Sequence, residues 1–356
     1  MTSFDNAVPL GGASPVITSA ASIEPKAIEH LWPGVLYMGK PTLIVGDPGL
    51  GKSLVTADIA ARVSTGRVWP LGTENSGAGD VVMCSAEDDP GDTIVPRLIA
   101  AGADRNRVEF FDGVLETDAD GEERMKALAL DRHIDQLAAV AARKKGRLKL
   151  VIVDPVAAFL GATDSHKNAE IRGLLAALAR VAAEYRFAVC VVAHLNKGTG
   201  ASAIYRISGS VAFVAAARAA YAVVRDPQDP LRRLVLPVKN NLGTDSSGFS
   251  YAINVADNDA PYVVWGDEAV TEETADQVLG GTHSTPRQEA INADVRAVCE
   301  WLKEALAKEA QPAADMWMQA EEKRFSKRDV ERAKRQLGVR AAAKGFAGRW
   351  QWELPR

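Results

Sequence analysis

The feature that most constrains this chain is a glycine-rich turn between an apolar run and an amphipathic stretch. Residues Gly46–Ser53 read Gly-Asp-Pro-Gly-Leu-Gly-Lys-Ser, which matches the pattern G-x-x-x-x-G-K-[ST]. Such glycines let backbone N–H groups wrap around phosphate oxygens, and the helix that follows adds its positive N-terminal end. We therefore predict a strand, a phosphate loop and a helix. The residues expected to bind ATP are Gly46, Asp47, Pro48, Gly49, Leu50, Gly51, Lys52 and Ser53.

Two residues of this loop have distinct expected roles. Lys52 is expected to reach the outer phosphates, and the Ser53 hydroxyl is expected to bind Mg²⁺. The apolar side chains Val55, Ile59 and Val63 follow at helical spacing, which supports a helix after the loop. ATP and Mg²⁺ are therefore the predicted ligands.

The apolar pattern of the chain predicts an α/β fold. Residues 81–84, 148–153 and 188–193 are apolar runs without polar alternation, and segments of helical periodicity separate them. Strands of this kind form parallel sheets covered by helices on both faces. Later runs alternate as antiparallel strands do, over residues 219–225, 233–239, 249–255 and 262–265. We expect a P-loop NTPase core whose mainly parallel sheet continues into antiparallel strands, with a long helix over residues 125–142.

Polar side chains follow the predicted parallel strands where each strand ends. Asp154 is placed to hold magnesium through water, as an acid at the Walker B position does, or alternatively to cap a helix. Glu87 is placed to activate the attacking water, with Asp88 as the rival for this role. His194 could sense the γ-phosphate or be a structural histidine at a strand end. The predicted catalytic and metal residues therefore gather at one edge of the sheet.

Two cations lie in later segments. Arg206 belongs to a small, polar stretch over residues 195–210 and could act as an arginine finger on a neighbouring subunit's nucleotide. Lys239 is a second candidate for that interface and for nucleotide binding. For both residues, solvent or a DNA phosphate is the alternative contact.

Composition and charge divide the chain into four predicted parts. These are a disordered leader over residues 1–24, an ATPase domain over 25–266, a linker over 267–287 and a C-terminal domain over 288–356. Residues 323–356 hold eleven basic and three acidic residues, against a net charge of −4 for the whole chain. Helices, one of them basic, followed by a short hairpin describe a winged helix-turn-helix. We expect this domain to contact DNA, although a solvated basic face is the alternative.

Composition also bears on the compartment. No apolar run approaches the ~20 residues that a membrane helix requires, and the N-terminus lacks the basic and apolar regions of a secretory signal. The three cysteines are far apart in apolar segments and show no zinc spacing. A cytoplasmic protein with reduced thiols and no membrane contact is expected.

Five motifs together resemble a known family. They are Gly-Asp-Pro-Gly-Leu-Gly-Lys-Ser53, Ser-Ala-Glu-Asp-Asp89, Val-Ile-Val-Asp154, Val-Val-Ala-His194 and Tyr-Arg206-Ile-Ser-Gly-Ser. Over roughly residues 25–265 the chain looks like the RecA-like ATPases of the RepA type, the hexameric plasmid and phage replicative helicases. The resemblance implies ATP hydrolysis between the subunits of a hexameric ring, with single-stranded DNA in the central channel. It also implies Glu87 as catalytic acid, Asp154 on magnesium, His194 as sensor and Arg206 as finger, with a winged-helix tail that could hold duplex DNA.

The sequence departs from related DnaB-type helicases at one strand. Those proteins carry Lys-x-Arg there, whereas this chain keeps Lys239 and has Asn241 at the arginine position. The expected finger therefore shifts toward Arg206. Three functions stay open: a DNA-dependent helicase motor, a DNA-binding regulator or replication-initiation factor switched by ATP, and a recombinase-like filament ATPase.

Overall fold

The computed structural model describes residues 17–117, 120–163, 167–194, 211–243, 247–279, 297–307, 310–343 and 350–354. The chain divides into two compact units, Met1–Gly280 and Gly281–Arg356, called here the larger and the smaller unit. The predicted leader lies outside the described residues up to residue 16, and residues 17–24 are exposed.

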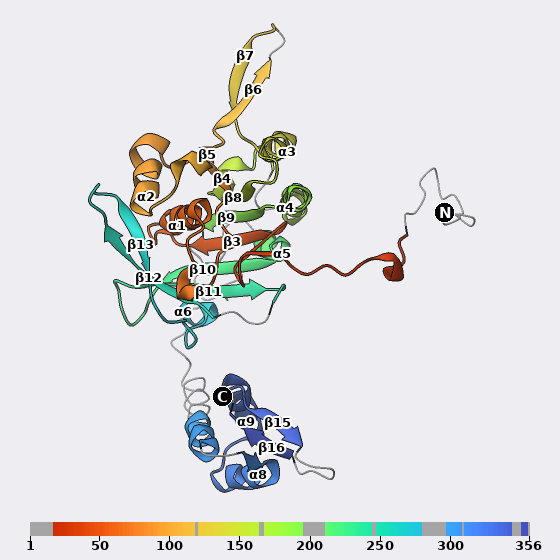
Figure 1. The fold of residues 1–356 in the computed structure, drawn as a ribbon, viewed down its shortest axis with the longest axis vertical. Helices are drawn as coiled ribbons and strands as arrows, with labels where there is room; N and C mark the ends of the chain where they lie inside the picture. Colours follow the sequence, from red (N-terminus) through yellow and green to blue (C-terminus); the bar gives the residue numbers. More distant parts are fainter. Residues whose placement is uncertain are drawn as a thin grey trace, which may run out of the picture. The chain divides into compact units, whose positions relative to one another are not determined.

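A nine-stranded sheet forms the centre of the larger unit (Figure 1). Its order is β13-β12-β11-β10-β3-β9-β8-β4-β5, and the six strands from β10 to β5 run parallel. The pairs β10–β11, β11–β12 and β12–β13 are antiparallel. The strands are β3 (Pro41–Gly46), β4 (Asp80–Ser85), β5 (Val108–Phe110), β8 (Leu148–Asp154), β9 (Ala188–His194), β10 (Ala219–Arg225), β11 (Arg233–Asn240), β12 (Phe249–Val255) and β13 (Pro261–Trp265). The predicted α/β class and the change from parallel to antiparallel strands are confirmed.

Helices cover both faces of this sheet because its central strands are apolar on both sides. In β3, Leu43 and Val45 join one core cluster, whereas Ile44 joins the other. The helices α1 (Lys52–Thr65) and α2 (Val95–Ala100) pack on the Ile44 face. The opposite face carries α3 (Ile134–Arg143), α4 (Asn168–Tyr185), α5 (Val211–Ala216) and α6 (Ala275–Leu279). Short elements complete the unit: η1 (Ala20–Ser22), β1 (His30–Trp32), β2 (Leu36–Tyr37), η2 (Pro70–Gly72), η3 (Pro90–Ile94), η4 (Arg105–Arg107) and η5 (Val156–Phe159).

The long helix predicted over residues 125–142 is wrong in its first half. Strands β6 (Gly113–Thr117) and β7 (Glu123–Ala127) form an antiparallel pair, and α3 begins only at Ile134. Around Met125 the pairing between strands therefore determines the structure, against the predicted helix. The Met125 side chain is exposed to solvent and does not pack into the core. The imidazole of His133 then accepts the backbone N–H of Ala129, which holds residues 129–133 in a turn before the helix.

The first part of the predicted linker over residues 267–287 packs on the larger unit. Val270 pairs with Gly248 beside β12, and Ala275 and Leu279 of α6 are buried in the core of the larger unit. Residues up to Leu279 therefore pack on that unit. Residues 280–296 lie outside the described part.

The smaller unit has its own apolar core. Its elements are a helix over residues 297–306, β14 (Gln311–Pro312), α8 (Ala313–Glu322), α9 (Lys327–Gln336), β15 (Arg340–Ala343) and β16 (Trp350–Glu353). The three strands form an antiparallel sheet in the order β14-β16-β15. Leu302, Met316, Val330 and Trp352 are buried together. Among the described helices of the whole chain, none is long and apolar enough to cross a membrane.

Candidate functional site

The carboxyl ends of four adjacent parallel strands meet at one edge of the sheet. The strand register sets Gly46 of β3 beside His194 of β9, and Asp154 of β8 beside Ser85 of β4. Glu87 follows β4 by two residues. The structure therefore brings the phosphate loop and the three predicted strand-end residues to a single edge, which is where ligands bind in α/β folds.

The phosphate loop needs glycine at two positions. A Cβ at Gly46 would lie 2.6 Å from the carbonyl oxygen of Val223 on β10, so no larger residue fits beside that strand. Gly51 has a φ of +91° and caps α1 through its carbonyl, which accepts from the N–H groups of Leu54 and Val55. The turn therefore stays tight and delivers Lys52 as the first residue of the helix.

Lys52 is buried against the loop. Its Nζ donates to the carbonyl oxygens of Gly46 at 2.9 Å and Asp47 at 3.0 Å, and lies 3.3 Å from Nδ1 of His194. Burial lowers the pKa of Lys52, while the nearby carboxylates of Asp154, Glu87 and Asp47 oppose that shift. A buried ammonium group held by carbonyl dipoles at this edge is suited to an anionic ligand.

Asp154 lies on the other side of the loop and is also buried. Thr56 Oγ1 donates to Asp154 Oδ2 at 3.1 Å, and Ser53 also hydrogen-bonds the carboxylate. Burial raises the pKa of Asp154, and these hydrogen bonds and the charge of Lys52 work against the rise. Thr56 is a site residue that sequence reasoning missed. Its position one helical turn after Ser53 was the signal that could have found it.

The structure separates the two rivals for the water-activating role. Glu87 Oε1 lies 3.5 Å from His194 Nε2, and the Glu87 side chain is 61 % exposed. Asp88 instead pairs with Arg97 on α2. Lys52, His194 and Glu87 therefore form a continuous row in which His194 contacts both neighbours. Asp88 is not part of this row, because its carboxylate forms an ion pair with Arg97.

Two strands far along the sequence hold the loop from outside. Tyr251 of β12 donates its hydroxyl to the Leu50 carbonyl at 2.7 Å, and Ile253 stands against Gly51. On β13, Trp265 Nε1 donates to Asp58 of α1 at 2.7 Å. Burial raises the pKa of Tyr251, so its hydroxyl stays a donor. Sequence reasoning missed this support because no local pattern links residues 50 and 251.

One of the two candidate finger residues, Lys239, does not lie at this edge. Lys239 pairs with Ala220, which is level with Leu43 near the start of β3, at the end of the strand opposite the phosphate loop. Its Nζ donates to the carbonyl oxygens of Val214 and Ala217, each at 2.8 Å, where α5 ends. Lys239 is therefore not brought to the nucleotide site of its own chain. Arg206 lies outside the described residues.

The residues of this edge fit Mg²⁺ and a nucleotide by their chemistry. Ser53 Oγ and the Asp154 carboxylate are adjacent oxygen ligands of the kind Mg²⁺ prefers, and among the described residues neither forms an ion pair within 4 Å. Gly46 leaves no room for a side chain in the loop, and Lys52 supplies the positive charge. Ser53 and Asp154 would hold the metal, and the loop with Lys52 would hold the phosphates.

The comparison with protein families agrees with this geometry. A family model described as the AAA domain matches residues 10–200, more than half of the chain, and that range contains the phosphate loop, Glu87, Asp154 and His194. No curated protein matches the sequence. The range also ends before β10, so the antiparallel strands lie beyond the match. The chain belongs to the AAA domain family, and its larger unit carries a P-loop ATPase domain that binds ATP.

Proposed function

We propose that the protein is a ring-forming, DNA-dependent ATPase of the RepA type, which uses ATP hydrolysis to separate DNA strands. The observation that carries the proposal is the row from Lys52 through His194 to Glu87 beside the phosphate loop. A carboxylate next to a histidine at this position suits water activation and γ-phosphate sensing. A metabolic kinase would need an acceptor site in place of that water.

Each residue of the row has a part in the proposed reaction. Magnesium-bound ATP supplies the γ-phosphoryl group and part of the charge neutralisation. Lys52 exchanges the carbonyls of Gly46 and Asp47 for phosphate oxygens, which costs little because its ammonium group is already desolvated. Glu87 accepts a proton from the attacking water, and His194 holds the water or the phosphate and links it to Glu87.

A cation from a neighbouring subunit completes the site in this proposal. Within the described residues, Lys52 is the cation at the phosphate loop, and Lys239 points to the opposite end of the sheet. An arginine finger typically contributes 10³ to 10⁵ in rate. We assign this role to Arg206 or Lys239 of an adjacent copy, which is why a ring, expected to be a hexamer, is proposed.

The smaller unit is proposed as a winged-helix module for DNA. Its order of helices, with the basic helix α9 before the strands β15 and β16, supports this assignment. Ser326 Oγ accepts the N–H of Asp329 and caps the start of α9. The surplus of basic residues after Lys323 supplies the attraction to phosphates.

The decisive test measures ATP turnover with and without single-stranded DNA, together with unwinding of a forked duplex. We expect DNA to stimulate turnover and Lys52→Ala to abolish both turnover and unwinding, because the phosphate charge then has no partner in the loop. Full turnover in Lys52→Ala would refute the ATPase assignment. Mass determination with an ATP analogue and single-stranded DNA tests the ring, since a monomer would remove the proposed roles of Arg206 and Lys239.

An ATP-switched DNA-binding regulator is the second candidate. The separate core of the smaller unit favours it, because such a module can bind duplex DNA without a motor. In that case Glu87→Gln would leave duplex binding intact and lock the ATP-bound form, and no strand separation would occur. A forked substrate that is bound but never unwound would select this alternative.

A further inference from the structure

Strands β6 (Gly113–Thr117) and β7 (Glu123–Ala127) form an arm that leaves the body of the larger unit after β5 (Figure 1). It pairs only within itself, as a two-stranded sheet separate from the nine-stranded one. Neither ATP binding nor DNA contact as proposed above uses this arm. It is therefore a candidate for a different interaction.

The strand register divides the arm into two faces, and one of them is fixed to the body. On that face Val114 packs against the core, and Glu116 contacts His133 at 3.1 Å. Because His133 Nδ1 accepts the N–H of Ala129, the ring proton sits on Nε2 and is donated to Glu116. The arm is thus held in one direction at its base.

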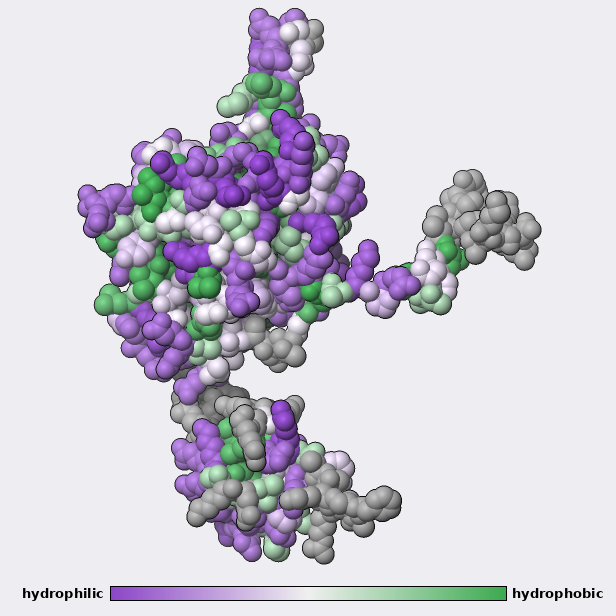
Figure 2. Space-filling view, viewed as in Figure 1, coloured by the Kyte–Doolittle hydropathy of each residue, from purple (hydrophilic) through white to green (hydrophobic). Residues whose placement is uncertain are grey.

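The opposite face of the arm is apolar near the middle and carries the acid Glu123 toward the tip. Leu115 and Met125 lie directly across from each other and are 64 % and 70 % exposed. Next toward the tip come Thr117 and Glu123, also paired and exposed. Residues 113–127 contain five acidic and two basic residues. Figure 2 shows the outer part of the arm as hydrophilic, with hydrophobic surface toward its base.

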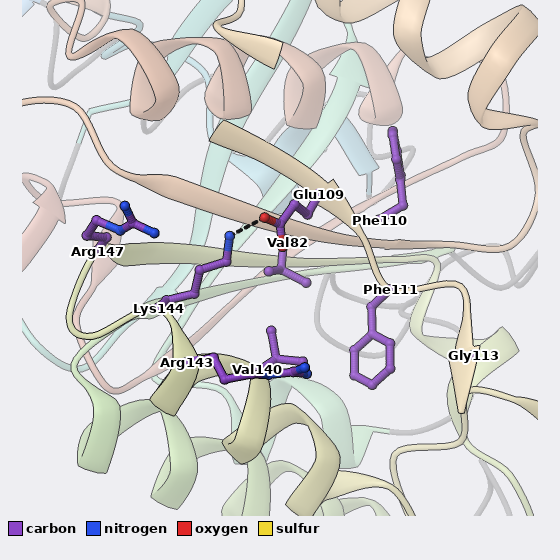
Figure 3. A pocket seen from close by; sticks show the side chains of 9 residues that line it. All are labelled: Val82, Glu109, Phe110, Phe111, Gly113, Val140, Arg143, Lys144 and Arg147. Carbon is purple, nitrogen blue, oxygen red and sulfur yellow. Dashed lines mark hydrogen bonds and ion pairs between the residues drawn. The ribbon is translucent and has the colours of Figure 1, made fainter. Parts of the chain in front are cut away.

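The surface at the base of the arm has the complementary character. A pocket of about 500 Å³ opens between β5 and the end of α3, and Gly113 forms part of its wall (Figure 3). Phe111 and Val140 give it an apolar side, and its charged side holds the bases Arg143, Lys144 and Arg147 together with the acid Glu109. Lys144 is paired with Glu109 and with the buried Asp80, and Arg147 also approaches Asp80, whereas Arg143 is exposed.

We propose that the arm docks onto a second copy of this chain, with each arm lying on the base pocket of the other. Gly113, the first residue of the arm, lies in the pocket wall, and the arm projects away from the body of its own chain (Figure 1), so the arm of another copy is the proposed occupant. If two arms lie antiparallel about a two-fold axis, each arm covers the base pocket of the other copy, so both pockets and both arms are buried together. Leu115 and Met125 of both copies then meet near the axis, and each Glu123 approaches the other copy's exposed Arg143. This contact would join two separate copies of the chain or, where the proposed ring forms, two rings to each other.

Disulfide trapping tests the contact directly. The three native cysteines are buried, so Leu115→Cys adds one exposed thiol close to its own counterpart across the proposed axis. We expect mild oxidation of the full chain to yield a covalent dimer. Val255→Cys is the matched control, because Val255 is 66 % exposed on β12, away from the arm.

Charge-reversal variants distinguish cross-linking through this specific contact from cross-linking by random collision. In the Leu115→Cys background, Glu123→Lys or Arg143→Glu should lower the cross-linked fraction roughly two- to five-fold, and the two together should restore it. Leu115→Ser with Met125→Ser should also halve the particle mass measured by light scattering. Cross-linking no better than in Val255→Cys, insensitivity to both reversals, or an unchanged mass would each overturn the proposal.

Discussion

His194 connects the phosphate-binding lysine to the proposed general base, since Lys52 contacts one of its ring nitrogens and Glu87 contacts the other. A base for water must be close to the γ-phosphate yet free of competing cations. Among the described residues Glu87 is paired with no lysine or arginine and lies beside His194, whereas Asp88 is paired with Arg97. The geometry therefore favours Glu87 for the role that the sequence left open between the two acids.

This difference predicts opposite results for two neighbouring substitutions. Glu87→Gln should lower kcat by about 10² to 10⁴ with little effect on ATP affinity, because it removes the general base but no phosphate contact. Asp88→Asn should leave kcat within about three-fold and instead lower the melting temperature slightly, through the partly exposed Asp88–Arg97 pair. Steady-state turnover and binding of a fluorescent ATP analogue distinguish the two. Loss of turnover in Asp88→Asn alone would reverse the assignment.

Asp154 illustrates a conflict between stability and function. Its pKa is raised in the folded chain by burial, so the folded state holds this proton more tightly than the unfolded state does. Stability therefore falls as pH rises from the unfolded carboxyl pKa of about 4 toward the folded value, and the penalty persists above it.

Asp154→Asn should thus stabilise the protein at neutral pH by about 1 kcal/mol while abolishing magnesium-dependent turnover. Urea unfolding at pH 8 and pH 5 measures the effect, and the gain should be larger at pH 8. Asp58→Asn is the contrasting variant, because Asp58 is paired with Arg62 and Arg67 and its loss should destabilise. Equal destabilisation by both substitutions would contradict this account.

At the scale of elements, the phosphate loop is supported by strands that come two hundred residues later. Tyr251→Phe removes the hydroxyl that binds the Leu50 carbonyl, and so frees the loop without opening a cavity. We expect ATP affinity to fall roughly three- to ten-fold, an effect equivalent to one lost hydrogen bond, while circular dichroism stays unchanged.

The control for Tyr251→Phe is Tyr262→Phe on the neighbouring strand β13, where the tyrosine is partly exposed and does not touch the loop. Calorimetric titration with an ATP analogue compares the two variants. Equal affinity for both would mean that the hydroxyl of Tyr251 has no positioning role.

Local patterns were enough to predict the elements that carry the site. The buried strands are predictable from apolar runs such as Leu148–Asp154, because unbroken apolar residues indicate a strand that is buried on both faces. The phosphate loop and the strand-end residues are then located by their positions next to these runs. The arm was not predicted, because the pairing of Leu115 with Met125 leaves no signal in either local segment. The partners Tyr251 and Leu50 meet only through the order of strands in the sheet, which spacing along the chain does not encode.

The whole molecule consists of two units with separate cores, and this has a thermodynamic consequence. Buried clusters around Leu302 and Trp352 belong to the smaller unit, and those around β3 belong to the larger one. Units with independent cores unfold independently. We expect differential scanning calorimetry to resolve two transitions.

An ATP analogue should raise only one of these transitions. Ligand at 100 times its Kd stabilises the unit that binds it by about 2.7 kcal/mol and leaves the other unchanged. Under the proposed function, a short DNA duplex should act on the second transition. A single transition shifted as a whole by the ATP analogue would show that the two units unfold cooperatively.

The position of β10 decides how small an expressible piece of this protein can be. The family match ends at residue 200, yet β10 pairs along β3 from Thr42 to Gly46, and β11 to β13 extend the sheet beyond it. A fragment that stops at the match would turn β3 into an edge strand with bare N–H and C=O groups, which invites aggregation. Expression and crystallisation work on the nucleotide site should therefore keep the chain through Leu279, where α6 ends.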